Sequence, residues 1–333
     1  STFWTREDLM RKIHGQIHNP FDLRNDPVFK VHVYQGGSSH ACLLITAHHI
    51  AIDGVSLDLV LRDVGRCYKY KTDRSSIDDP VSMTAEHHSI FETTATSVFE
   101  FASLQSQYLN STEGERLWQC WQRELLGHTT LNLQCDFKRP AVQETKGDVV
   151  TVEIQQNIVQ NLKLFAQHNN VTTYTVLLTV FSCLLHKYSG QDDILIGSPM
   201  SGRTLDDTQL EESVGNFVNP VCIRSTVTDE LTFRQKCEQM FGRVINALEW
   251  QAYPFALLVE RMANFRDNSR SPLFQVLFSL NQSFLEDEES GGSTGERINL
   301  GGIILSPMAN IQQSVSPFDI SLVVTEGSQD HMT

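Results

Sequence analysis

Residues 27–68 carry the pattern that most restricts how this chain can fold. In PVFKVHVYQ, residues 27–35, apolar and polar residues alternate and several are β-branched valines. A GGSS turn signal and the apolar run HACLLITAHH follow. This order predicts a hairpin whose second strand is buried on both faces. After Asp53 and Gly54 the spacing becomes that of an amphipathic helix, with Ser56 as its expected cap. The stretch predicts a strand, a loop and a helix in direct succession.

Strand and helix patterns continue in the second half of the chain. Helices are expected up to Asn19 and at 96–108, 114–126, 157–170 and 173–190, and strands at 148–154 and 193–203. The β-α-α-β order after residue 148 indicates a mixed sheet with helices packed against it, which is an α/β architecture. A turn-rich connector precedes it, so we expect two lobes, residues 1–148 and 149–333. A cleft between two such lobes is a natural place for a ligand.

Charge argues against two classes of partner. The 333 residues hold 40 acidic and 26 basic side chains, for a formal net charge of −14. Such a surface repels phosphate backbones and anionic lipid, so neither nucleic acid nor a membrane surface is the expected partner. The sequence also has no signal segment and no apolar run of membrane-spanning length.

The cysteines indicate a compartment. Seven are scattered along the chain, odd in number and without a C-x-x-C pair. Several lie inside apolar runs, such as Cys42 in ACLLITA and Cys183 in VFSCLLH. Reduced, buried thiols have this distribution, which predicts a cytoplasmic protein.

The stretch AHHIAIDGVS, residues 47–56, places paired histidines at the predicted end of a buried strand. Histidine exchanges protons near neutrality. Asp53 could orient an imidazole or tie the loop to a distant arginine, and Gly54 would let the chain turn sharply. Acid–base chemistry and a loop without chemistry both stay open. A metal site is disfavoured, because zinc needs three or four ligands and no further Cys/His cluster appears.

A second histidine pair provides a comparison. His87 and His88, with Glu92 four residues later, repeat part of the pattern. This pair lacks the preceding buried strand, the glycine and the following helix, so we interpret it as a solvated loop or helix start.

HHIAIDG resembles the HHxxxDG motif of condensation domains from nonribosomal peptide synthetases. Further matches to that family, in the family's order, are PFDLRNDPVFKV (20–31), FEFASLQ (99–105), DFKRP (136–140), IGSPMSGR (196–203), VGNFVNPVCIR (214–224), WQAYPFALLVERM (250–262), RDNSRSPLFQVLFSLNQ (266–282) and SPFDISLVV (316–324). The chain departs from the family pattern at Val55, often tryptophan, and at Ala252 and Ala256, usually acidic. Family members usually carry more sequence at both ends, so the resemblance implies a partial domain.

The resemblance implies a two-lobed fold of the chloramphenicol-acetyltransferase type, with a tunnel between the lobes. Upstream and downstream carrier proteins would deliver thioesters on phosphopantetheine arms, and the domain itself would bind no cofactor or metal. The acceptor amine would attack the donor thioester to form an amide. Neighbouring adenylation or ketosynthase modules would be further partners.

The resemblance also implies roles for individual residues. His49 would act on the attacking amine and His48 would shape the loop. Asp53, next to Gly54 of the motif, would pair with an arginine of the second lobe, for which we choose Arg203. The GNFVN segment, through Gly215, Phe217 and Asn219, would line the substrate tunnel.

Three alternatives stay open beside condensation. An epimerisation domain shares the fold and the motif, and DGVS is reminiscent of that subtype, although VGNFVNP and RDNSRSPLFQV fit condensing members better. Ester-forming relatives with a hydroxyl acceptor would look the same. A non-catalytic member would only recruit partners. The sequence favours condensation, and gives no code for donor or acceptor.

Overall fold

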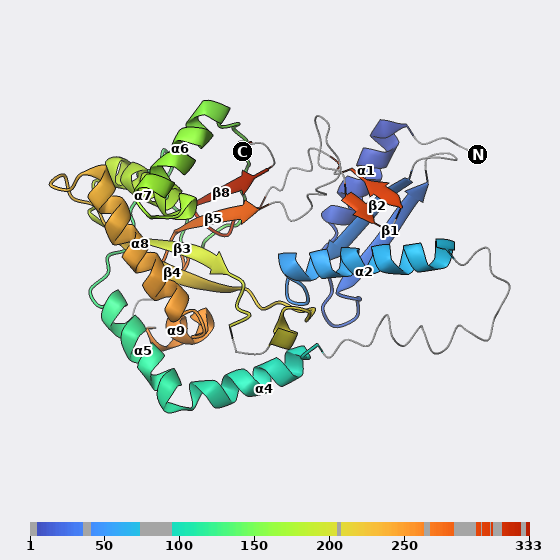
Figure 1. Ribbon diagram of the computed structural model, residues 1–333, viewed down its shortest axis with the longest axis horizontal. Coiled ribbons are helices and arrows are strands. Elements are labelled where there is room, and N and C mark those ends of the chain that lie inside the picture. Colours follow the sequence, from blue (N-terminus) through green and yellow to red (C-terminus); the bar gives the residue numbers. More distant parts are fainter. Residues whose placement is uncertain are drawn as a thin grey trace. The chain divides into compact units, whose positions relative to one another are not determined.

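The computed structural model describes residues 5–35, 41–73, 95–204, 208–262, 267–282, 298–300, 302–306, 308, 315–327 and 331–333. The chain forms two compact units, which Figure 1 shows with their elements labelled. Unit 1 comprises residues 1–100, 208–217 and 297–311, and unit 2 comprises residues 101–207, 218–296 and 312–333. These borders differ from the predicted lobe border at residue 148, because residues 101–148 pack within unit 2.

Unit 1 combines helices with two small hairpins. Its elements are helices α1 (Arg6–Ile17) and α2 (Gly54–Asp73), the short 3-10 helix η1 (Thr208–Leu210), and strands β1 (Phe29–Gln35), β2 (Ala41–Ala47), β6 (Ile298–Leu300) and β7 (Ile303–Leu305). Both strand pairs, β1–β2 and β6–β7, are antiparallel. The predicted strand, loop and helix order over residues 27–68 is thereby confirmed.

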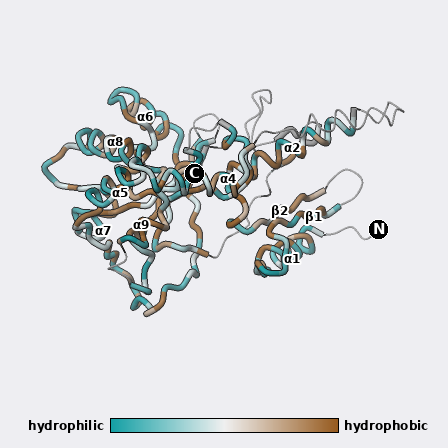
Figure 2. Tube along the Cα trace, turned by 90° about the horizontal axis from the view of Figure 1, so that it is seen from below, coloured by the Kyte–Doolittle hydropathy of each residue, from teal (hydrophilic) through white to brown (hydrophobic). Residues whose placement is uncertain are grey.

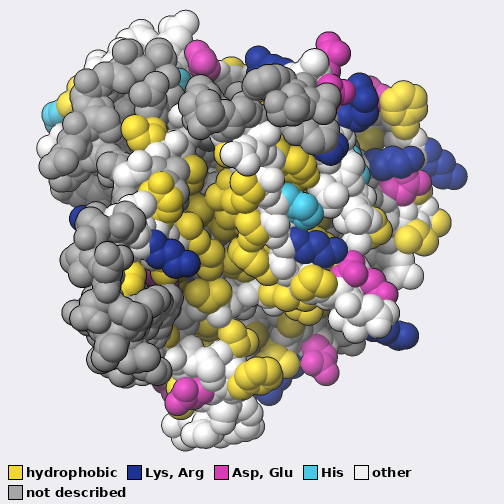
Figure 3. Space-filling model, turned by 90° about the vertical axis from the view of Figure 1, so that its right-hand side faces the viewer, with side chains coloured by type: hydrophobic (Ala, Val, Ile, Leu, Met, Phe, Trp, Pro, Cys, Tyr) yellow, Lys and Arg dark blue, Asp and Glu magenta, His cyan; other side chains and the backbone are white. Residues whose placement is uncertain are grey.

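The β1–β2 hairpin is covered on one face only. Leu44 is buried, whereas Val31 and Val33 on the opposite face are 50% and 66% exposed. Leu43, the register partner of Val33, is also exposed. The expectation that the second strand is buried on both faces was therefore wrong. Figure 3 shows hydrophobic side chains gathered in the middle of one face of the molecule.

Unit 2 is built on a mixed four-stranded sheet. The strands β3 (Asp193–Met200), β4 (Asn219–Thr226), β5 (Val276–Gln282) and β8 (Ile320–Glu326) lie in the order β4-β3-β5-β8. Strands β3 and β4 are antiparallel, while β5 is parallel to both β3 and β8. Helix α4 (Val98–Leu109) begins in unit 1 and continues into unit 2, and unit 2 also holds α5 (Thr112–Leu125), α6 (Gln156–His168), α7 (Thr173–Ser189), α8 (Phe233–Glu249) and α9 (Phe255–Arg261). The α/β class with a mixed sheet is confirmed.

The core of unit 2 explains why α5 belongs to it. Leu117, Trp121 and Leu125 recur every four residues on α5 and are at most 1% exposed. They pack in one apolar cluster with residues of β3 and β4, among them Ile194 and Ile223. The Trp121 indole N–H also donates to the Trp250 carbonyl at 3.1 Å. Figure 2 shows how hydrophobic and hydrophilic residues alternate along such helices.

The strand predicted at 148–154 does not form. Ile154 makes an isolated β-bridge to Met332, and this bridge does not extend into a ladder. Val150 and Val152 are 87% and 66% exposed. An alternating apolar pattern becomes a strand only where a neighbouring strand supplies partners, and along this segment the described residues supply one for Ile154 alone.

Three further sequence expectations concern membranes, thiols and the second histidine pair. No helix among the described residues is long and apolar enough to cross a bilayer. All seven cysteines are free thiols, and burial raises the pKa of Cys222 and Cys183 above the usual range. His87 and His88 lie outside the described residues.

Candidate functional site

The loop after β2 is anchored where it begins. The backbone N–H of His48 donates to the Val28 carbonyl at 2.8 Å, and the N–H of Ala51 donates to the His48 carbonyl at 3.0 Å. Residues 49–51 form a turn. The two histidines therefore sit on a tight turn attached to the hairpin, at the strand-to-loop junction that the sequence predicts.

The His48 ring is engaged within this loop. Its Nδ1 accepts the backbone N–H of Ile50 at 3.1 Å, so the proton of the neutral ring resides on Nε2. The ring of Phe21 lies edge-on to it, with centroids 5.9 Å apart. A hydrogen bond to the chain and an aromatic neighbour restrict the ring, and the loop-shaping role of His48 stays a prediction.

The His49 side chain differs from that of His48 in its exposure and in its hydrogen bonding. It is exposed, and its ring makes no hydrogen bond with any of the residues that the structure describes. A ring of this kind is available to a second molecule. Its position depends on how firmly the two ends of the loop are held.

Asp53 closes the loop and starts helix α2. The residue is 3% exposed, and its Oδ1 accepts the backbone N–H of Ser56 at 2.8 Å. Asp53 is thus the N-cap, and the expectation that Ser56 caps the helix was wrong. The reason lies in spacing, because a cap accepts from the amide three residues later, and Ser56 is already the third residue of α2.

Asp53 and Ser56 bind a segment that lies far away in the sequence. Oδ2 of Asp53 accepts the Phe217 N–H at 3.1 Å, and the N–H of Asp53 donates to the Gly215 carbonyl at 3.0 Å. The Ser56 hydroxyl donates to that same carbonyl at 2.8 Å and accepts the Gly215 N–H at 3.0 Å. We call these contacts of Asp53 and Ser56 with Gly215 and Phe217 the polar clamp. The structure thus brings Gly215 and Phe217 to the histidine loop, within unit 1.

The two glycines of the predicted site differ in their surroundings. Gly54 is the first residue of α2, is exposed, and has nothing within 4 Å of an added Cβ. Its φ is not positive, so its backbone conformation is one that other residues also adopt, and its role in a sharp turn before the helix stays a prediction. An added Cβ at the buried Gly215 would lie 2.5 Å from Val98 Cγ2 and 2.8 Å from Phe217 Cε2. A larger residue at position 215 would therefore force the side chains of Val98 and Phe217 to shift.

Asn219, at the start of β4 in unit 2, uses its amide to hold the loop before α9. Its Nδ2 donates to the carbonyls of Gln251 and Tyr253 at 2.8 and 2.9 Å, and its Oδ1 accepts the Phe255 N–H at 2.8 Å. The N-cap of α9 is Pro254, which has no side chain able to cap. Asn219 supplies that missing acceptor from across the fold. Its role in lining a tunnel stays a prediction.

Arg203 is half-buried in unit 2, next to Gly202, whose φ is +68°. Its pairing with Asp53 stays a prediction. Asn219 and Arg203 are thus the two predicted site residues that lie in unit 2, while the six others, His48, His49, Asp53, Gly54, Gly215 and Phe217, lie in unit 1.

Further charged groups of unit 1 lie on α2 and at Glu212. Arg62 donates to both carboxylate oxygens of Glu212, at 3.0 and 2.5 Å, and this hydrogen-bonded pairing lowers the pKa of Glu212. Burial raises the pKa of Asp58, one turn into α2. Nowhere in the described part of the chain do three His, Cys, Asp or Glu side chains gather as a metal site requires.

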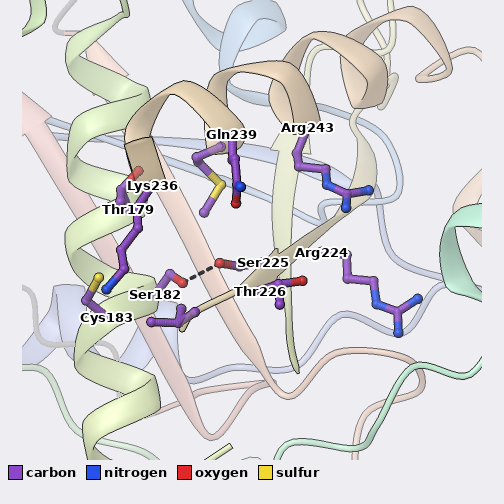
Figure 4. A pocket seen from close by; sticks show the side chains of 11 residues that line it. Thr179, Ser182, Cys183, Arg224, Ser225, Thr226, Lys236, Gln239 and Arg243 are labelled. Atoms are coloured by element: carbon purple, nitrogen blue, oxygen red, sulfur yellow. Dashed lines mark hydrogen bonds between the residues drawn. The ribbon is translucent and has the colours of Figure 1, made fainter. Parts of the chain in front are cut away.

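A basic pocket in unit 2, between α7, β4 and α8, is the other concentration of polar groups (Figure 4). Arg224 donates to both oxygens of Asp193 at 2.7 and 2.9 Å, and Arg243 contacts both oxygens of Glu124. Within each pair, the carboxylate neutralises the charge of its arginine. Lys236 points away from both arginines, towards Cys183, so the cations do not converge on one ligand.

A comparison with known families identifies the family of this chain. A family model described as "Condensation domain" matches residues 4–333. The chain belongs to the condensation domain family. The HHxxxDG stretch that carried the resemblance is the loop from His48 to Gly54 described above.

Relatives of this domain are large peptide synthases. Gramicidin S synthase 2 of Brevibacillus brevis is 31% identical over 326 residues, which cover 98% of this chain and 7% of that protein. Tyrocidine synthase 2 of Brevibacillus parabrevis is 31% identical over 97% of this chain and 8% of its own length. Bacitracin synthase 1 of Bacillus licheniformis is 29% identical over 97% and 6%. The chain thus spans less than a tenth of each of these relatives.

Solved structures show the same fold at lower identity. A four-domain nonribosomal peptide synthetase bound to AMP and glycine matches with a TM-score of 0.76 and 23% identity, over 98% of this chain and 24% of the other. The X-domain from teicoplanin biosynthesis gives 0.76 and 20%, over 99% and 70%. The condensation domain of the monacolin K polyketide synthase gives 0.76 and 14%, over 98% and 70%. The fold is that of condensation domains, of the chloramphenicol-acetyltransferase type.

Proposed function

We propose that this domain forms an amide bond between a donor acyl or peptidyl thioester and the amine of an acceptor aminoacyl thioester. Both substrates would arrive on phosphopantetheine arms of carrier proteins. One observation supports this most. His49 presents an exposed imidazole, free of hydrogen bonds to the described chain, from a loop anchored at both ends. Membership of the condensation domain family supplies the reaction class.

The reaction needs a group that accepts a proton. The acceptor nitrogen attacks the donor carbonyl carbon, the new C–N bond forms, and the C–S bond to the donor phosphopantetheine breaks. The His49 imidazole accepts the proton that the amine loses and returns it to the departing sulfur. A positioned general base contributes about 10²–10⁴-fold to a rate, and alignment of two tethered substrates contributes still more.

The remaining site residues would support His49. His48 holds the turn through its Nδ1, and Asp53 fixes the end of the loop through the polar clamp. Gly54 leaves open space at the first turn of α2, where a substrate arm can pass. We retain Arg203 as the proposed partner of Asp53, and Gly215, Phe217 and Asn219 as the proposed tunnel segment.

The proposed partners follow from the relatives. Those synthases are more than ten times as long as the matched segment, so further domains accompany it there. We infer that this domain works between an upstream and a downstream carrier protein, beside adenylation or ketosynthase modules. No cofactor of its own is required for the chemistry above.

Intact-mass analysis of carrier-bound product tests the proposal. The complete domain receives loaded donor and acceptor carriers, with a His49→Ala variant beside the wild type. We expect the donor-plus-acceptor mass to accumulate with the wild type and about 10²-fold more slowly with the variant. Full activity of His49→Ala would contradict the role of His49, and a folded wild type that forms no product with several substrate pairs would contradict condensation.

Epimerisation is the second candidate, because the motif ends in DGVS with Val55. Such an enzyme would exchange the α-proton of a carrier-bound aminoacyl group. Incubation in deuterated water followed by mass analysis distinguishes the two reactions, since condensation leaves that position unlabelled. An ester-forming member would give product only with a hydroxyl acceptor. Carrier binding without any reaction would indicate a recruiting role.

A further inference from the structure

We propose that Ser56 is a positioning residue for His49, acting through Gly215. This inference rests on the proposed function of His49. Ser56 lies on the first turn of α2, is 0% exposed and cannot contact a substrate in this structure. Its hydroxyl instead joins the helix that follows the histidine loop to a segment 159 residues further along the chain.

The contact demands a hydroxyl group. Ser56 Oγ donates its proton to the Gly215 carbonyl at 2.8 Å and accepts the Gly215 N–H at 3.0 Å. One side-chain atom thus satisfies both backbone groups of a buried residue, as a neighbouring strand would. Serine and threonine can do this, whereas alanine can do neither, and a thiol is a weak substitute.

The contact also fixes where the loop ends. The Gly215 carbonyl accepts the Asp53 N–H at 3.0 Å as well as the Ser56 hydroxyl, and Asp53 Oδ1 accepts the Ser56 N–H. Asp53 and Ser56 are therefore held against one carbonyl. At the other end, the His48 N–H is held by Val28. His49 lies between these anchors, and its own ring contributes no restraint.

Loss of the hydroxyl should loosen the clamp without detaching the segment. The Arg62–Glu212 ion pair and the bond from Phe217 to Asp53 would still hold residues 208–217 to α2. The Gly215 N–H would be buried without its described acceptor, so residues 213–217 would open more often. Misplacement of a catalytic group by about 1 Å can cost 10²-fold in rate.

Two variants and a matched control test this inference in the complete domain. Ser56→Ala removes the hydroxyl and Ser56→Thr keeps it. Ile13→Val, at a buried position of α1 in the same unit, lowers stability without touching the clamp. Each is assayed with saturating carriers well below its own melting temperature, and amide exchange of residues 213–217 is followed by mass spectrometry.

Ser56→Ala should lower kcat about 10–100-fold, with the KM for both carriers unchanged and faster exchange at 213–217. Ser56→Thr should recover most of kcat, and Ile13→Val should leave it unchanged. Equal kcat for Ser56→Ala and Ile13→Val would overturn the positioning role, as would slow exchange at 213–217 in Ser56→Ala. If Ser56→Thr melts early, its amide exchange at 213–217 is compared with that of Ser56→Ala. Slower exchange in Ser56→Thr shows that the hydroxyl contact is retained, and equal exchange contradicts the inference. Failure of the proposed function is seen separately, as full activity of His49→Ala.

Discussion

The interiors of the two units are stabilised by different kinds of contact. Unit 2 buries large apolar side chains between a mixed sheet and its helices, with Trp121, Phe274 and Phe278 each at most 1% exposed. Unit 1 combines two helices and a 3-10 turn with two short hairpins, and it buries the polar residues Asp53 and Ser56 where the histidine loop meets α2. Apolar burial tolerates small displacements, whereas hydrogen bonds demand fixed geometry. The end of the loop that carries His49 is thus held by polar contacts of fixed geometry.

The segment VGNFVN, residues 214–219, belongs partly to unit 1 and partly to unit 2. Up to Phe217 it belongs to unit 1 and offers its backbone to Asp53 and Ser56, while from Val218 it belongs to unit 2. There Asn219 reverses the roles, because its side chain binds the backbone of residues 251–255. Four mutational predictions sharpen this contrast.

Removal of a core aromatic should have the largest effect. Trp121→Ala deletes a fully buried ring of unit 2 together with its bond to the Trp250 carbonyl. We expect a loss of about 3–5 kcal/mol in the free energy of unfolding, measured by denaturant titration. Trp118→Ala, on the same helix but only partly buried, is the control and should cost less. Equal losses would show that apolar burial does not dominate unit 2.

Asp53→Ala should rank second. It leaves the N–H groups of Ser56 and Phe217 without their acceptor, at a cost of about 2–4 kcal/mol for two bonds to a charged group. Asp53→Asn keeps one acceptor oxygen and caps a helix nearly as well, so it should recover part of the stability. A melting curve of Asp53→Ala that matches wild type would refute the polar clamp as a structural element.

Asn219→Ala should follow, at about 1–3 kcal/mol, because the Phe255 N–H and two loop carbonyls lose their partner. Asn219→Asp can still accept from Phe255 but can no longer donate to residues 251 and 253. Its second carboxylate oxygen would oppose those two carbonyl oxygens, so it should be destabilised at least as much as Asn219→Ala. Proteolysis of the 250–255 loop, compared among the three proteins, provides the measurement, and identical cleavage rates would exclude the bracing role.

The smallest effect is expected for the exposed Arg62–Glu212 pair. Its pairing lowers the pKa of Glu212, so its contribution is complete above the ordinary carboxyl pKa of about 4.3 and is lost as pH falls through the lower value in the folded state. Because both groups are partly exposed, we expect about 0.2–1 kcal/mol. Unfolding titrations of wild type and Arg62→Gln should differ at pH 7 and converge in acid. A constant difference down to pH 2 would contradict this linkage.

Local patterns predicted much of the fold. Period and turn chemistry placed α1, the β1–β2 hairpin, α2, α4 to α7 and β3 close to their observed bounds. The stripe Leu117, Trp121 and Leu125 shows that α5 is buried, but an amphipathic pattern does not identify the surface it packs against. The sequence therefore could not show that α5 packs in unit 2, and the predicted lobe border was placed after this helix, at residue 148.

The site was predictable in its residues but not in its bonds. HHxxxDG and GNFVN were both recognisable, yet their contact spans about 160 residues and involves the backbone of Gly215, which leaves no local signal. Ser56 was noticed only as a cap, because serine near a helix start is a common capping residue. The observed three-residue spacing from Asp53 to Ser56, a capping distance, could have assigned the cap to Asp53 instead.

The polar clamp has a consequence for recombining synthetases. Asp53 and Ser56 bind main-chain atoms of residues 215 and 217, so they do not read the side chains of Val214, Asn216 or Val218. A chimera joined anywhere between Ser56 and Gly215 would therefore keep this contact, provided that each parent retains aspartate, serine and glycine at these three positions. The hydrogen bonds of the clamp would then form between two halves of different origin.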